Sequence, residues 1–71
     1  MHARHPLTAA QREDLGDARL VLESAAHNAR VACGPLIAAD DAAQALANAT
    51  AQAEQGLATL RRILTGIRNA G

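Results

Sequence analysis

Three histidines and one cysteine are the residues of this chain best suited to metal binding or catalysis. His2 and His5 lie three positions apart near the start of the chain, and His27 is distant from both. No cysteine or carboxylate completes a compact ligand set of the kind that zinc requires. We therefore expect no metal site and no cofactor.

The other candidates for chemistry are Cys33 and the pair Asp40 and Asp41. Cys33 has no neighbouring His or Lys that could activate it as a nucleophile. Adjacent side chains at a helix start do not face each other, so helix capping explains the two aspartates better than catalysis. Gly34 belongs to no phosphate-binding motif. The sequence predicts a protein that is not an enzyme.

Apolar residues recur at alternating steps of three and four positions through most of the chain, which is the pattern of an α-helical stripe that packs on another helix. The pattern predicts an all-α fold of the coiled-coil type. The positions are Leu15, Ala18, Leu22, Ala25, Ala29, Ala32, Leu36, Ala39, Ala43, Leu46, Thr50, Ala53, Leu57, Leu60, Leu64 and Ile67.

Gly34-Pro35 interrupts the stripe, because proline cannot continue a helix and glycine commonly follows a helix end. Residues 1–7 are expected to be a flexible tail, and residues 8–71 a single helical-hairpin domain. Its first helix is expected at about 8–33, its turn at about 34–40 and its second helix at about 41–69. At the first helix, Thr8 and Gln11 have the spacing of a capping box.

The start of the second helix has two interpretations. Pro35 could occupy its first position, or a short connector could lead to Asp40 or Asp41 as the N-cap. We favour the second interpretation because it gives two helices of similar length.

An antiparallel hairpin would place Leu15 opposite Leu60, Ala18 opposite Leu57 and Leu22 opposite Ala53, so that large residues mostly face small ones. Beside this row it would place Val21 opposite Gly56 and Arg19 opposite Glu54. The alternative is one long helix with a kink, since the repeat keeps its phase across the break. The predicted core of the hairpin or of an oligomer is Leu15, Leu22, Ala29, Leu46, Ala53, Leu57, Leu60, Leu64 and Ile67.

The small size of the chain predicts a partner. It has 71 residues, no aromatic residue and one cysteine, so neither large core side chains nor disulfides support a lone hairpin. We expect a homodimer of hairpins that forms a four-helix bundle. Leu20 and Val31 face away from the stripe and, with Ile63, Arg61 and Arg62, form the candidate surface for a further protein partner.

The charge pattern argues against other partners. Seven arginines balance seven acidic residues, which disfavours general binding to nucleic acid or to an anionic membrane. No apolar run is long enough to span a bilayer, and no signal peptide is evident. We expect a cytoplasmic location and, from the arginine and alanine usage, a bacterial or phage origin.

These observations favour a non-catalytic interaction module, a small regulator or inhibitor that binds a larger protein by helix packing. A structural coiled-coil element is one alternative. Another is a co-chaperone or assembly factor, because the break Ala32-Cys33-Gly34-Pro35 and the stretch 53–60 resemble small helical-hairpin co-chaperones of type III secretion needle subunits. This chain lacks the aromatic residues of that family's second helix, so no binding residue is transferred from it.

Overall fold

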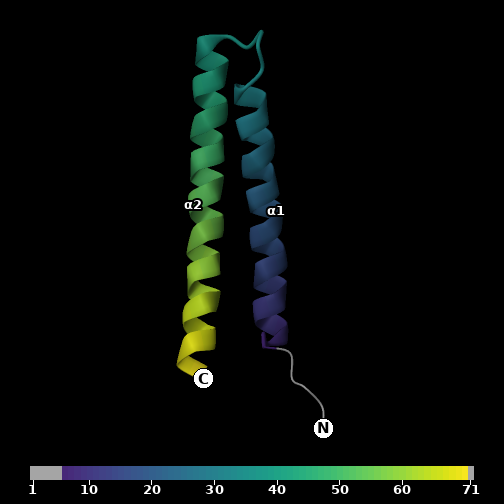
Figure 1. The fold of residues 1–71 in the computed structure, drawn as a ribbon, viewed down its shortest axis with the longest axis vertical. Coiled ribbons are helices and arrows are strands. Elements are labelled where there is room, and N and C mark those ends of the chain that lie inside the picture. The colour runs from purple at the N-terminus through teal and green to yellow at the C-terminus, as the bar shows by residue number, and fades with distance from the viewer. Residues whose placement is uncertain (1–5, 71) are drawn as a thin grey trace.

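The computed structural model describes residues 6–70, which form two helices, α1 (Ala9–Ala32) and α2 (Ala39–Ala70). The helices lie side by side and run in opposite directions (Figure 1). The predicted helical hairpin is therefore present, and the alternative of one long kinked helix is wrong. The molecule measures 57 × 20 × 14 Å, so it is a single layer of two helices.

The ends of α1 follow the local sequence. The Thr8 hydroxyl accepts a hydrogen bond from the Gln11 N–H at 3.0 Å, and the Gln11 side chain accepts one from the Thr8 N–H at 2.9 Å. This is the predicted capping box, which satisfies two backbone donors that the helix leaves free. Cys33 is the C-cap, and Gly34 follows it without adopting a positive φ.

The start of α2 differs from the prediction. Neither Asp40 nor Asp41 is the N-cap, because the helix begins at Ala39 and the Ala38 carbonyl accepts from the Ala42 N–H at 2.9 Å. Both aspartates instead lie in the first turn, where their negative charge interacts favourably with the helix dipole.

The facing sides of the two helices form a seam of small and polar residues. Seam positions are those that are buried or half-buried and that repeat at steps of three and four along each helix. On α1 they are Gln11, Asp14, Ala18, Val21, Ala25, Asn28 and Ala32; on α2 they are Ala42, Ala45, Ala49, Gln52, Gly56, Thr59, Ile63 and Gly66.

Side chains of α1 pack tightly against α2 at Gly56. A Cβ atom placed there would lie 2.6 Å from the Leu22 Cγ and 3.2 Å from the Val21 Cγ1. Both α1 side chains therefore pack directly on the α2 backbone. At Gly66 a Cβ would lie 2.9 Å from the Gln11 Nε2, which is the end of a flexible side chain and can move aside.

This seam corrects the predicted pairing of the hairpin. The expected position of Val21 opposite Gly56 is confirmed. We expected Leu22 to face Ala53, but it also contacts Gly56, and α2 turns its small residues rather than its leucines toward α1. Alanine and glycine allow the backbones to approach more closely than leucine does, which brings apolar atoms of both helices into contact. The expected approach of Arg19 to Glu54 is also absent, since Arg19 pairs with Glu23 at 3.7 Å on its own helix.

Gly56→Ala should destabilise the hairpin despite the better helix propensity of alanine. Its methyl group collides with Leu22, and the overpacking cost of roughly 1–3 kcal/mol exceeds the propensity gain of about 1 kcal/mol. We expect a net loss of about 1 kcal/mol in the free energy of unfolding, measured by urea denaturation at fixed protein concentration.

Gly16→Ala is the matched control, because a Cβ at Gly16 meets nothing within 4 Å. This change should stabilise the protein by up to about 1 kcal/mol. Equal stabilisation by both substitutions would contradict the close approach at Gly56.

Candidate functional site

One broad side of the hairpin is an apolar surface, which we call the leucine face. Each of its residues follows a seam residue by one position, which is a rotation of about 100° around the helix. Since the helices are antiparallel, this rotation carries both sets of side chains to the same side of the hairpin. The leucine face consists of Leu15, Leu22 and Ala29 on α1 and Ala43, Leu46, Thr50, Ala53, Leu57, Leu60, Leu64 and Ile67 on α2.

Much of the leucine face is exposed. Leu46, Leu57 and Leu64 are 53%, 43% and 45% exposed, and Leu22 and Leu60 are half-buried at the edge of the seam. These residues belong to the predicted core, yet the hairpin does not cover them because it closes on the adjacent row of α2. A contiguous apolar surface of this kind on a small protein is typical of an interaction site.

Thr50 does not interrupt the apolar character of this surface. Its hydroxyl donates to the Leu46 carbonyl at 2.8 Å within α2. The polar atom is therefore satisfied by its own helix, and the side chain offers a methyl group to a partner.

Charged residues border the leucine face. Arg12 and Arg19 lie along its α1 edge, and Glu54, Arg61 and Arg68 lie along the outer edge of α2; all five are exposed. An apolar centre with a charged rim is the usual composition of a protein–protein interface.

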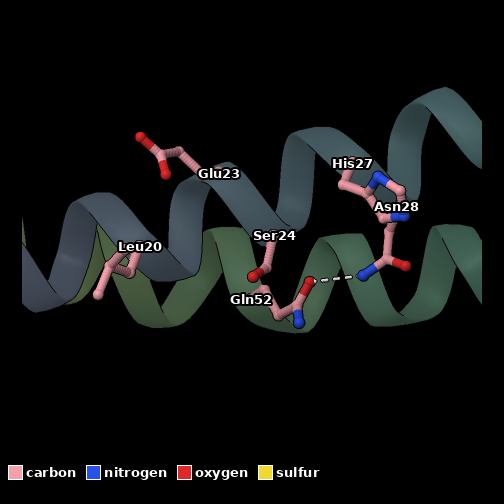
Figure 2. Close-up of a pocket in the computed structure, with 6 residues that line it drawn as sticks. All are labelled: Leu20, Glu23, Ser24, His27, Asn28 and Gln52. Atoms are coloured by element: carbon pink, nitrogen blue, oxygen red, sulfur yellow. Dashed lines mark hydrogen bonds between the residues drawn. The ribbon is translucent and has the colours of Figure 1, made fainter.

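The opposite side of the hairpin is polar. Asn28 on α1 donates through Nδ2 to the Oε1 of Gln52 on α2 at 2.8 Å, and Figure 2 shows this bond bridging the helices. The pair lines an open groove of about 450 Å³ together with Leu20, Glu23, Ser24 and His27. In Figure 2 the Glu23 side chain points away from α2, so it does not face the groove floor.

The predicted partner surface is divided by the fold. Leu20 and Val31 are 57% and 42% exposed, and Leu20 lines the polar groove. Arg61 and Arg62 are exposed as well, and the Arg62 guanidinium lies 3.7 Å from the Asp14 carboxylate on this polar side. Ile63 was expected on this partner surface, but it is buried in the seam between the two helices and is not accessible to a partner.

The residues considered for chemistry remain separate. Within residues 6–69, no group of three His, Cys, Asp or Glu side chains could hold a metal ion. His2 and His5 lie outside the described residues, and Cys33 is exposed with a free thiol. In the described part of the chain, neither helix has an apolar stretch long enough to cross a membrane.

Sequence reasoning missed the hydrogen bond between Asn28 and Gln52. Gln52 lies in the α2 row that contains Ala42, Ala49 and Gly56, and Asn28 lies in the α1 row that contains Ala18, Ala25 and Ala32. Pairing these two rows of small residues, instead of the leucines, would have placed both amides in the seam.

Asn28→Ala should destabilise the hairpin by about 1 kcal/mol, because the half-buried Gln52 amide loses its partner. The double variant Asn28→Leu/Gln52→Leu removes both amides and should recover most of this loss. Thermal denaturation followed by circular dichroism measures both effects. Additive losses in the two positions would show that the amides do not act as a pair.

Comparison of the chain with protein-family models, with curated proteins and with solved structures gives no match. The hairpin has two surfaces with exposed apolar side chains: the leucine face, and a polar side with exposed Leu20 and Val31.

Proposed function

We propose that this chain is a non-catalytic protein–protein interaction module that acts on a larger protein as a regulator or inhibitor. The observation that carries the proposal is the leucine face, which this hairpin leaves uncovered. Folded domains usually consist of two packed layers around one core, and this hairpin supplies one layer. Helices from another chain complete the core.

The simplest completed core is a four-helix bundle. Two hairpins of this chain make one as a homodimer, and one hairpin with a helical hairpin of a different protein makes one as a heterodimer. In either arrangement the polar side stays accessible, and Leu20 and Val31 offer apolar anchors there for the larger protein.

The main alternative is a co-chaperone or assembly factor whose core is completed by its client. The single-layer architecture supports it, because such a chain orders fully only when its leucine face is covered. Circular dichroism of the purified chain separates the two. A chain that is stably helical alone supports the regulator, and one that gains helicity on adding a client supports the assembly factor.

The double substitution Leu20→Ser/Val31→Ser tests the partner surface. We expect it to weaken the complex with the larger protein by about tenfold or more, since two apolar anchors are lost, without loss of helicity. The complex is identified by affinity purification of the tagged chain from the cells that produce it, followed by quantitative mass spectrometry.

Ala47→Ser/Ala58→Ser serves as the matched control, because both alanines are exposed on the outer side of α2. It should retain the partner. A third variant, Leu57→Ser/Leu64→Ser, removes two exposed residues of the leucine face. If the co-purified proteins stayed the same for all three variants, neither surface would bind a partner and the proposed function would be wrong.

A further inference from the structure

We infer that the leucine face is covered by a second copy of this chain, with α2 packed antiparallel on α2 of the partner about a two-fold axis at the level of Gln55. This inference rests on the proposed function and specifies which chain completes the core. Three observations support it: the order of residue sizes along α2, the charges beside the axis and the exposed area.

The α2 part of the leucine face changes in size along its length. Its first half contains Ala43, Leu46, Thr50 and Ala53, of which only Leu46 is large, and its second half contains Leu57, Leu60, Leu64 and Ile67. An antiparallel two-fold arrangement brings the small half of each copy onto the large half of the other. A parallel arrangement would place leucine on leucine at one end and alanine on alanine at the other, which packs poorly.

The two-fold axis at Gln55 gives four layers of contact. Ala43 faces the partner's Ile67, and Leu46 faces the partner's Leu64. Thr50 faces the partner's Leu60, and Ala53 faces the partner's Leu57. Three of the four layers combine a small residue with a large one, and the hydroxyl of Thr50 is already bonded within its own helix. The stripe is thus complementary to itself, as a two-fold interface requires.

Opposite charges meet beside the proposed axis. Glu54 and Arg61 lie next to the leucine face on the outer edge of α2, and within residues 6–69 neither forms an ion pair. The antiparallel arrangement brings Glu54 of each copy near the partner's Arg61, so the pair occurs twice.

The exposed area agrees with a dimer. A compact monomer of this mass exposes about 4,200 Å², whereas this chain exposes 5577 Å². The hairpin therefore exposes more surface than a compact protein of its mass, and a standard interface buries roughly 800 Å² of each partner. A second copy of equal length covers such a surface.

Exchanging the sizes of Ala53 and Leu57 tests the axis directly. Leu57→Ala creates two cavities in the dimer and should weaken dimerisation roughly a hundredfold, measured by sedimentation equilibrium. Ala53→Leu overpacks the same two layers and should weaken it about tenfold or more. The double variant Ala53→Leu/Leu57→Ala restores a large residue opposite a small one, so its dimerisation should return to within about threefold of wild type. Additive losses in the double variant would overturn the proposed register.

A charge exchange gives a second test that leaves the apolar core intact. Glu54→Arg and Arg61→Glu each create two like-charge contacts at the rim, and each should weaken the dimer by about threefold to tenfold. The double variant Glu54→Arg/Arg61→Glu should recover the wild-type affinity at low salt. Failure to recover would contradict the antiparallel pairing.

Cys33 provides a readout of orientation. It is the one cysteine of the chain and is exposed at the turn, so a nitroxide spin label can be attached there. The proposed axis places the two turns at opposite ends of the bundle. With a helix rise of 1.5 Å per residue, the two labels are then about 33 Å apart along the length of the bundle. Electron-spin distance measurements should give this value. Labels within about 20 Å would place both turns at one end and overturn the inference.

The outcomes separate this inference from the proposed function. A folded monomer that still binds a different protein through Leu57 and Leu64 would refute the second copy and leave the interaction module standing. A dimer with the expected label distance, in which changes at Leu20 and Val31 affect no complex, would uphold the second copy and refute the regulator.

Discussion

The packing of Leu22 on the Gly56 backbone is the contact on which the rest of the hairpin depends. It fixes how near the two helices come and which positions face each other along their length. A methyl group at Gly56 would separate the helices, and a shift along the axis would bring a larger α2 residue under Leu22. The small residues of the seam therefore permit one alignment of the two helices along their length, although none of these residues has special chemistry.

This close approach decides what the protein presents to its surroundings. Because the small row of α2 faces α1, the neighbouring row of leucines must face perpendicular to the hairpin plane. The same rotation on α1 places Leu15 and Leu22 on that side, so the two helices share one apolar surface. An exposed apolar surface thus results from the close packing of small residues in the seam, without a loop or a cavity being built for it.

The polar side has a different role in the architecture. The bond between Asn28 and Gln52 gives the seam a directional contact among apolar ones, and shifting the helices along each other would break it. The ion pair of Arg62 with Asp14 lies on the same side and is largely exposed, so it contributes little stability. Polar pairing on one side and leucines on the other make the two sides of the layer chemically distinct.

The amino-acid sequence by itself determined the two helices, the capping box of Thr8 and Gln11, and the helix break at Gly34-Pro35, because these depend on contacts between residues a few positions apart. It also showed that the leucines lie on one stripe. The tertiary structure alone decided which stripe closes the hairpin. Helix α2 has two neighbouring rows of apolar residues. The spacing of apolar residues along the sequence favours the row with the larger side chains as the one that packs on α1. Which row of α2 faces α1 depends on how closely the two helix backbones can approach. The row of alanine and glycine allows the closer approach, and the spacing of residues along the sequence does not report that distance. For the same reason Ile63 is buried while Leu57 and Leu64 are exposed.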